Sequence, residues 1–431
     1  MRITIITLGT RGDVQPFVAL ALGLQQAGHS VTLASTIDYE AFINSYGLKF
    51  WPIQVHFRHW MKTDAGRAVM DPGQNIVHSL RQLNYIAQSI IERCLVDSWA
   101  ACENAEAVIY GAVALLLTMA HIQPVLNIPC FQVKMQPGLY PTGAFPPPAV
   151  PLIPKRLADG FWPLRLYNRL MYRVLEQLFW QPLRPQINRW RQNSLNLRPL
   201  PWRGPYQAYY QQRLPGLYGY SPRLIPRPND WPDWHYVTGF WYLDAPPGWQ
   251  PPPDLVDFLD AGPPPLAVSF GSTLFQNGEQ VRETIVQAIT ETGHRAIFIS
   301  GWGGLGLEHL PDNAFACRSV PYDWLLPKVK AIIHHGGAGT TAAALRAGIP
   351  SVTIPVFADH PFWARRLAEL KLGSKPIPRS RLTRDRLVGA IKAATEDGGL
   401  SDNAAQFRPL IQAETGVQNA VNIIQHYLAR G

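Results

Sequence analysis

With 431 residues and 47% hydrophobic content, the chain is too long for one ordinary core and predicts two domains of about 200 residues each. The net charge of +9 would admit a nucleic-acid partner, but the basic residues form no Lys/Arg blocks and no reader motif is present, so we exclude nucleic acid. No apolar run reaches about 18 residues, and the apolar start is interrupted at Gly9, which favours a first strand over a signal peptide.

The cysteines indicate the compartment. Cys94, Cys102, Cys130 and Cys317 have neither paired spacing nor an accompanying histidine set suited to a metal. We therefore expect reduced, buried thiols and a soluble cytoplasmic protein, or one bound peripherally at the inner face of a membrane.

Strand and helix patterns alternate in both halves of the chain. A first strand over Ile3–Leu8 is followed by a helical pattern over Phe17–Ala27 and a second strand over Val31–Ser35. The same order returns in the second half, over Leu266–Phe270, Val281–Thr292 and Ala296–Ser300. This alternation predicts an α/β protein in which both halves are doubly wound units.

The acidic residue after the first strand has two interpretations. Asp13 follows the strand directly, at the edge of a parallel sheet where ligands bind, so its carboxylate can act as a general base. Alternatively, Asp13 is the N-cap of a helix that begins near Val14.

An amphipathic basic helix is predicted over residues 163–180. Its basic residues fall at i, i+4 and i+8: Arg165, Arg169 and Arg173. Its apolar residues lie mostly on another face: Leu166, Leu170, Met171, Val174, Leu178 and Phe179. Two interpretations stay open. The helix packs on its domain with solvated arginines, or, together with Trp162 and Trp180, it brings the protein to an anionic membrane surface.

A glycine-rich segment in the second half has the chemistry of a diphosphate cradle. His335–Thr341 reads His-Gly-Gly-Ala-Gly-Thr-Thr and lies between an apolar run and a helix-forming run, which predicts a strand, a turn and a helix start. The glycines let the backbone approach an anion, and the helix N-terminus adds partial positive charge. The hydroxyls of Thr340 and Thr341 can cap the helix and donate to phosphate oxygens, and His335 can donate a further hydrogen bond. A bare glycine turn would indicate only a tight strand-to-helix connection.

The flanking sequence favours a ligand site. A later hydrophobic strand ends at Asp359 and His360, where α/β sheets place ligands, and these two side chains could hold sugar hydroxyls. No Asp-x-Asp pair suited to Mg²⁺ or Mn²⁺ occurs, so we expect no metal and no cofactor. The cradle alone would then stabilise the charge of a departing diphosphate.

Together these segments resemble the donor signature of UDP-sugar glycosyltransferases, most closely the sterol 3-beta-glucosyltransferase branch. The segments that carry this likeness are Val320–Leu325, His334–Thr341, Leu345–Gly348 and Asp359–Trp363. The segment Gly9–Pro16 independently resembles the opening of sterol and antibiotic glycosyltransferases of the GT-B fold. The likeness covers residues 1–50 and 265–380, whereas residues 51–235 show no pattern that we can place.

The resemblance implies roles for the matching residues. Asp13 becomes the catalytic base, His335 contacts the diphosphate, and Ser272 matches a loop serine that faces phosphate. The expected donor-binding residues are Gly12, Ser272, Val320, His335, Gly337, Gly339, Thr340, Thr341, Asp359 and His360. Two positions depart from the wider pattern. Ala343 stands where a ribose-binding Glu is found, and His360 stands in place of Gln, which leaves the sugar open.

The resemblance also implies the domain organisation. In the GT-B fold, two Rossmann-like domains face each other across a cleft. We expect an acceptor-binding domain over residues 1–235, a Pro-rich linker over 236–265, a nucleotide-sugar-binding domain over 266–405, and a helical segment over 406–431 that returns to the first domain. Packing alone could equally explain the amphipathic pattern of Val417–Tyr427 in this last segment.

The implied function is that of an inverting, metal-independent hexosyltransferase. It would move a hexose, with glucose favoured, from a UDP-sugar to the hydroxyl of a lipophilic acceptor, with a sterol or similar lipid alcohol as first choice. An enzyme that glycosylates a polyketide, peptide antibiotic or carotenoid-like alcohol is the alternative of the same class. The non-enzyme alternative is a catalytically silent homologue that binds nucleotide or lipid.

Overall fold

A computed structural model describes the chain except for residues 71–75, 112–113, 139, 149–161, 276, 303–304, 308–309, 397 and 431. The chain divides into two compact units. Unit 1 comprises Met1–Trp60, Leu80–Leu243 and Thr415–Gly431. Unit 2 comprises Met61–Ser79 and Asp244–Glu414. The main chain thus leaves unit 1 after Leu243 and returns to it at Thr415.

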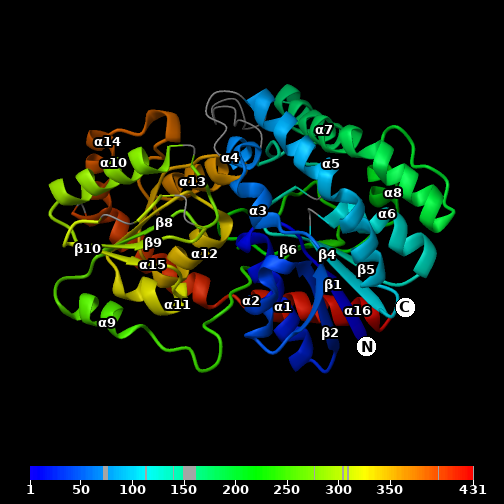
Figure 1. The fold of residues 1–431 in the computed structure, drawn as a ribbon, viewed down its shortest axis with the longest axis horizontal. Helices are drawn as coiled ribbons and strands as arrows, with labels where there is room; N and C mark the ends of the chain where they lie inside the picture. Colours follow the sequence, from blue (N-terminus) through cyan, green and yellow to red (C-terminus); the bar gives the residue numbers. More distant parts are fainter. Residues whose placement is uncertain are drawn as a thin grey trace. The chain divides into compact units, whose positions relative to one another are not determined.

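Unit 1 is built on a seven-stranded sheet in the order β3-β2-β1-β4-β5-β6-β7, with every strand pair parallel. Its strands are β1 (Arg2–Ile6), β2 (Ser30–Thr36), β3 (Lys49–Ile53), β4 (Ala107–Gly111), β5 (Cys130–Lys134), β6 (Gly216–Tyr218) and β7 (His235–Val237). Its helices are α1 (Arg11–Gln26), α2 (Glu40–Asn44), α3 (Phe57–Lys62), α5 (Ile76–Ala100), α6 (Leu115–Leu126), α7 (Trp162–Leu195), α8 (Tyr206–Gln211) and α16 (Gly416–Leu428) (Figure 1).

Unit 2 is built on a five-stranded parallel sheet in the order β10-β9-β8-β11-β12. Its strands are β8 (Leu266–Ser269), β9 (Ala296–Ile299), β10 (Ala314–Cys317), β11 (Ala331–His334) and β12 (Ser351–Thr353). Its helices are α4 (Asp64–Met70), α9 (Pro253–Asp260), α10 (Gly278–Glu291), α11 (Tyr322–Leu325), α12 (Ala338–Ala347), α13 (His360–Glu369), α14 (Arg384–Thr395) and α15 (Gly399–Gln412).

Both sheets are doubly wound, as the sequence predicts. In each, the strand order runs outward in one direction from the first strand and then reverses, so a topological switch point lies between β1 and β4 in unit 1 and between β8 and β11 in unit 2. Ligands of open α/β sheets bind at such points, beyond the carboxyl ends of the strands. The two segments with predicted site chemistry follow β1 and β11.

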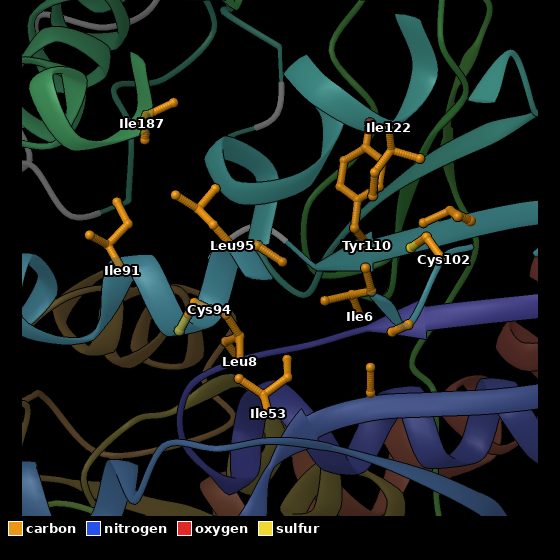
Figure 2. Close-up of a cluster of buried hydrophobic side chains, with 14 of the residues drawn as sticks. Ile6, Leu8, Ile53, Ile91, Cys94, Leu95, Cys102, Tyr110, Ile122 and Ile187 are labelled. Carbon is orange, nitrogen blue, oxygen red and sulfur yellow. The ribbon is translucent and has the colours of Figure 1, made fainter. Parts of the chain in front are cut away.

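The core of unit 1 explains the unplaced residues 51–235. The central strands β1 and β4 are apolar and buried, as expected for parallel strands covered on both faces. Figure 2 shows part of their cluster, in which Ile6 and Tyr110 of these strands lie near Leu95 of α5 and the cluster extends to Ile187 of α7. The region contains two long helices, α5 and α7, and the three-residue strand β6, and a strand that short leaves almost no periodic signal.

The C-terminal helix packs within unit 1. Helix α16 lies against α1 (Figure 1), and the contact is close because a Cβ added at Gly23 would lie 2.6 Å from Cγ1 of Val417. Asn419 also donates to the Thr238 carbonyl at 2.9 Å. The expected return of the terminal helix is confirmed, whereas the preceding helix α15 belongs to unit 2.

The Pro-rich region is divided between the units. After Leu243, the main-chain N–H of Ala245 donates to Oδ2 of Asp323 at 3.0 Å, and Asp244 forms an ion pair with Arg346. Pro253 is the first residue of α9, where its missing N–H leaves no intrahelical bond unmade. These contacts join the second part of the region to unit 2.

Helix α7 does not fit the first of its two interpretations, in which it packs on its domain and only its arginines are solvated. Leu166 and Leu170 of its apolar face are 61% and 54% exposed. Trp180, considered as a membrane contact, is fully buried and donates from Nε1 to the Trp202 carbonyl at 2.8 Å. The buried side of the helix is instead anchored by polar contacts to distant loops, such as Asn168 to the Gly143 carbonyl at 2.9 Å.

The four cysteines form no disulfide with one another, and burial raises the pKa of Cys94, Cys130 and Cys317 to about 12. They are therefore protonated thiols at neutral pH. Within the described part of the chain, no helix combines the length and the apolar character that crossing a bilayer requires.

Candidate functional site

The turn between β1 and α1 is closed by a capping box. Thr10 is the N-cap of α1, and the carboxylate of Asp13 reaches back to it, so Oδ2 accepts from the Thr10 N–H at 2.8 Å and from its hydroxyl at 3.0 Å. The helix thus begins at Arg11, and the interpretation of Asp13 as the N-cap of a helix near Val14 is wrong. Asp13 caps from inside the first turn instead.

Neighbouring residues fix this carboxylate at the switch point of unit 1. Gly9 has a φ of +129°, and a Cβ there would lie 2.4 Å from Oδ2 of Asp13, so only glycine fits beside the carboxylate. Tyr39 donates to the Gly9 carbonyl at 3.3 Å, and burial, with the charge of Asp13 adding to it, raises the pKa of the Tyr39 hydroxyl. Gly12 lies exposed in the same turn, where a Cβ would meet only the Thr10 hydroxyl, at 3.7 Å. The sequence did not single out Thr10 or Tyr39.

The turn between β11 and α12 has the opposite character. Gly337 is the N-cap of α12, and as a glycine it has no side chain to cap the helix; within the described part of the chain, no other side chain is seen to accept from the helix start. Thr340 and Thr341 occupy the third and fourth helical positions, so the expectation that their hydroxyls cap the helix is wrong. Thr341 is fully buried, and its Oγ1 finds no hydrogen-bond partner among the described residues. The helix N-terminus therefore keeps main-chain N–H groups without a side-chain acceptor.

His335 is held between two glycines. A Cβ at Gly337 would lie 2.3 Å from Nε2 of His335, and a Cβ at Gly271 would lie 3.2 Å from its Cε1. Gly336, which links His335 to Gly337, turns the chain at that point with a φ of +86°. At Gly339 an added Cβ would meet nothing within 4 Å, so the first turn of α12 has open space on that side.

Three histidines meet at this turn. The rings of His335 and His360 are in edge contact, with centroids 4.5 Å apart, and His334 accepts at Nδ1 from the Gly336 N–H at 3.1 Å. Burial lowers the pKa of His334 and His360 to about 3, with a neighbouring histidine adding to each shift. Burial and His360 also lower the pKa of His335 well below its ordinary value, although a bond to the Ser269 backbone opposes this. All three are neutral at pH 7, so His335 can donate a hydrogen bond without bringing a charge.

The loop after β8 lies beside His335. Ser269 pairs in register with His334 of the adjacent strand, which places the following Gly271 and the half-buried Ser272 next to the cradle. The Gly271 carbonyl accepts from the N–H of Trp302 at 3.2 Å, so the loops after β8 and β9 support each other.

The segment that begins at Val320 contacts the end of β8, just before this loop. Val320 is buried in an apolar cluster of unit 2. Tyr322, two residues later, shares a 2.6 Å hydrogen bond between its hydroxyl and that of Ser269. Sequence reasoning did not select either hydroxyl residue, because the bond joins residues that lie 53 positions apart in the chain.

Asp359 and His360 open helix α13 beside the cradle. Oδ2 of Asp359 accepts from Nε1 of Trp363 at 2.8 Å, and His360 is buried against His335. Ala358 adopts a φ of +51° just before them, which turns the chain back toward β11. The structure therefore gathers Ser272, His335, Asp359 and His360 at one edge of the unit 2 sheet.

A pocket of about 670 Å³ lies against the same loops. Phe275 and Trp302 line it, together with the cations Lys62 and Arg67 from the segment that groups with unit 2. These cations fall in the region that showed no sequence pattern. Among the described residues, no group of three or more His, Cys, Asp or Glu side chains is placed to hold a metal ion.

Two family models match the chain. The glycosyltransferase family 28 N-terminal domain matches residues 3–142. The C-terminal domain of erythromycin biosynthesis protein CIII-like proteins matches residues 285–425.

Relatives and solved structures agree with these matches. The sterol 3-beta-glucosyltransferase UGT80A2 of Arabidopsis thaliana is 35% identical over 99% of this chain and 66% of its own length. The O-mycaminosyltylonolide 6-deoxyallosyltransferase of Streptomyces fradiae is 34% identical over 99% of this chain and 97% of its own. The chain spans only 27% of a sterol 3-beta-glucosyltransferase of Cryptococcus neoformans, at 32% identity.

The solved structures are similar over the full chain. The glycosyltransferase of kitacinnamycin has a TM-score of 0.67 at 20% identity and covers 99% of this chain and 98% of its own. SsfS6 of Streptomyces sp. SF2575, complexed with thymidine diphosphate, has a TM-score of 0.64 at 18% identity, with 99% of each chain covered. With the two parallel sheets, these likenesses establish the GT-B fold, and the sequence matches show that the chain belongs to the glycosyltransferase family that includes sterol and antibiotic glycosyltransferases.

Proposed function

We propose that this protein transfers a hexose from a nucleoside diphosphate sugar to the hydroxyl of a lipophilic acceptor, with inversion at the anomeric carbon. UDP-glucose is the favoured donor, and a sterol or similar lipid alcohol is the favoured acceptor. The observation that carries the proposal is the uncapped N-terminus of α12, with open space at Gly339 and a neutral His335 beside it. Such a terminus stabilises an anion through its N–H groups and the helix dipole.

In the proposed reaction, the acceptor hydroxyl attacks the anomeric carbon while the bond to the diphosphate breaks. Asp13 accepts the hydroxyl proton, and the negative charge passes to the leaving diphosphate, which the α12 turn, His335, Thr340 and Thr341 receive. Ser272 donates to a phosphate oxygen from the facing loop, and Gly12 leaves room beside the base. No metal enters this sequence of steps.

Asp359 and His360 are proposed to select the sugar. Asp359 already accepts from Trp363, so one of its oxygens is oriented, and His360 is packed on His335. A sugar held by these residues lies next to the diphosphate that His335 contacts. The nucleotide of the donor also has to be tested. Thymidine diphosphate is the alternative to UDP, because a structural neighbour was solved in complex with it.

The Streptomyces relative favours a second acceptor class. It matches this chain over nearly its whole length, and its name gives O-mycaminosyltylonolide as the acceptor. An antibiotic or polyketide alcohol is therefore the alternative to a sterol. A cytoplasmic protein that meets its acceptor at a membrane surface would suit the sterol proposal.

One experiment tests donor and acceptor together. The purified protein is incubated with UDP-glucose, UDP-galactose or TDP-glucose and with sterols, other lipid alcohols or a macrolide alcohol, and products are detected by mass spectrometry. We expect a sterol hexoside from UDP-glucose. Slow release of the nucleoside diphosphate from the sugar donor, without an acceptor, would still identify a transferase. Donor binding with no release of nucleoside diphosphate under any condition would indicate a silent binder.

A further inference from the structure

Helix α7 presents a row of large apolar side chains to solvent. These residues, here called the apolar stripe, recur every four positions: Trp162, Leu166, Leu170, Val174 and Leu178. Their exposed fractions are 72%, 61%, 54%, 41% and 47%, in that order. Folded monomers rarely expose a contiguous apolar row of this kind unless it meets a partner.

The seating of α7 on unit 1 explains why the stripe faces outward. The packed side of the helix consists of the residues two positions further on: Leu164, Asn168, Tyr172, Glu176 and Trp180. Each residue advances the helix by about 100°, so positions two apart lie on opposite faces. Because Asn168 bonds to Gly143 and Trp180 to Trp202, the helix cannot rotate to bury the stripe without breaking both anchors.

A basic row borders the stripe. Arg165, Arg169 and Arg173 each precede a stripe residue by one position and are exposed. Arg169 and Arg173 extend over the surface toward Asp230, at 2.9 Å, and Glu176, at 3.1 Å, and keep about half of their side-chain surface in solvent.

Acidic groups offset part of this basic row, because Arg169 pairs with Asp230 and Arg173 with Glu176. Glu176 is the one acidic residue in α7, against six arginines, and its carboxylate accepts from the Tyr210 hydroxyl on the packed side. Burial raises the pKa of Glu176, although the hydrogen bond from Tyr210 and the nearby Arg173 oppose this. The surface around the stripe is therefore apolar with a positive margin.

These features suit a lipid surface better than a second copy of the chain. From Trp162 to Leu178 the stripe extends about 24 Å along the helix at about 1.5 Å per residue. Because four residues turn the helix by about 400°, the stripe also shifts by about 160° around the axis, which stays within the apolar half of a helix that lies in the plane of a bilayer. Arginines beside such a helix reach the lipid phosphates while their stems stay apolar. A second copy would instead bring its own arginine row and its own charge of +9 against this one.

We propose that α7 is an interfacial helix that seats unit 1 on an anionic bilayer. The apolar stripe enters the boundary between headgroups and acyl chains, and Arg165, Arg169 and Arg173 contact lipid phosphates. This deepens the proposed function, because a lipid alcohol acceptor resides in such a bilayer. In this proposal, the leucines contribute to the binding free energy as well as the arginines. The aromatic residue at the interface is Trp162, because Trp180 is buried.

Co-sedimentation with vesicles tests the proposal without donor or acceptor, so its outcome is separate from that of the transfer assay. The full chain is mixed with vesicles of phosphatidylcholine alone or with 30% phosphatidylglycerol added. The test variant carries Leu166→Gln, Leu170→Gln and Leu178→Gln. The matched control carries the same change at Val96, Val125 and Leu410, which are exposed to a similar degree on other helices. Glutamine is a good helix former and these sites are exposed, so both variants should fold.

We expect the wild-type protein and the control to bind the anionic vesicles, at least tenfold more tightly than neutral ones, with weaker binding at high salt. The stripe variant should bind at least tenfold more weakly than the control. Vesicles with bromine-labelled acyl chains should quench wild-type tryptophan fluorescence, and Trp162→Phe should remove much of that quenching. Equal binding by stripe variant and control would overturn the proposal. So would sedimentation of the wild-type protein as a dimer that the stripe variant converts to a monomer.

Discussion

The turns after β1 and β11 occupy equivalent places in their sheets, yet their chemistry is opposite. In unit 1 the helix start is closed by Thr10 and the carboxylate of Asp13, which takes up the N–H groups and brings a negative charge. In unit 2 the helix start has Gly337 as N-cap and no side-chain acceptor from the residues that the structure describes. In the proposed reaction, the same strand-to-helix connection supplies the base in one unit and receives the diphosphate in the other. The difference lies in the residues at the helix N-terminus, which are Thr10 and Asp13 in unit 1 and Gly337 in unit 2.

The largest expected effect is the loss of the base in the first turn. Asp13→Asn keeps an oxygen that can accept from Thr10, so the fold and the cap should persist, but the side chain can no longer take a proton. General bases contribute about 10²- to 10⁴-fold, so we expect kcat to fall by about 10³-fold with little change in the donor KM. Steady-state kinetics and a thermal melt of the same sample measure both. Near-normal turnover would remove Asp13 from the chemistry.

The second turn is tested by filling its open space. Gly339→Ala adds a methyl group that meets nothing in the unliganded protein, so stability should be unchanged or slightly higher. If the diphosphate occupies that space, UDP affinity should fall about 10- to 100-fold, or about 1.4–2.8 kcal/mol. Isothermal titration gives the affinity. Gly389→Ala in α14, also without neighbours, is the matched control and should bind UDP like the wild type. Wild-type affinity in Gly339→Ala would place the diphosphate elsewhere.

The histidine cluster of the second turn makes the stability of unit 2 depend on pH. The folded pKa values of His334 and His360 are about 3, below the ordinary 6.5, so unfolding takes up protons between these values. Stability from this source is fully present above about pH 6.5 and falls with decreasing pH, by about 1.4 kcal/mol per pH unit for each histidine. His360→Gln removes one of these histidines. Between pH 6.5 and 4.5, the free energy of unfolding of the variant should therefore fall less steeply, by about 1.4 kcal/mol per pH unit. Urea titrations at several pH values measure it, and parallel wild-type and variant profiles would contradict it.

The smallest expected effect concerns a single hydroxyl of the second turn. Thr341 is buried with its Oγ1 unpaired among the described residues, so Thr341→Val should leave the melting temperature unchanged or raise it slightly. If the hydroxyl donates to a phosphate, the UDP dissociation constant should rise by about tenfold or less, the range of one ordinary hydrogen bond. An unchanged dissociation constant would make Thr341 a packing residue only.

The sequence predicts these turns better than it predicts their details. Gly9–Pro16 and His335–Thr341 are local patterns, so their places after buried strands could be read directly. The identity of each cap could not, because Asp13 and Gly337 compete with neighbours for that role, and the outcome depends on backbone angles at Gly9 and Gly336.

Non-local contacts explain the remaining errors. The outward face of α7 depends on partners such as Gly143, Trp202 and Asp230, which the spacing within the helix does not reveal. Likewise, the contact between His335 and His360 joins two motifs from different strands. The donor-binding residues stay a prediction from the sequence, and the contacts among them could not be predicted from it.

The central claim is that the open N-terminus of α12 receives the diphosphate of the donor. A crystal structure of the protein with UDP tests it most directly. The account predicts phosphate oxygens within hydrogen-bond distance of the main-chain N–H groups of Gly339 and Thr340, with the His335 ring beside them. A diphosphate bound away from residues 335–341 would contradict it.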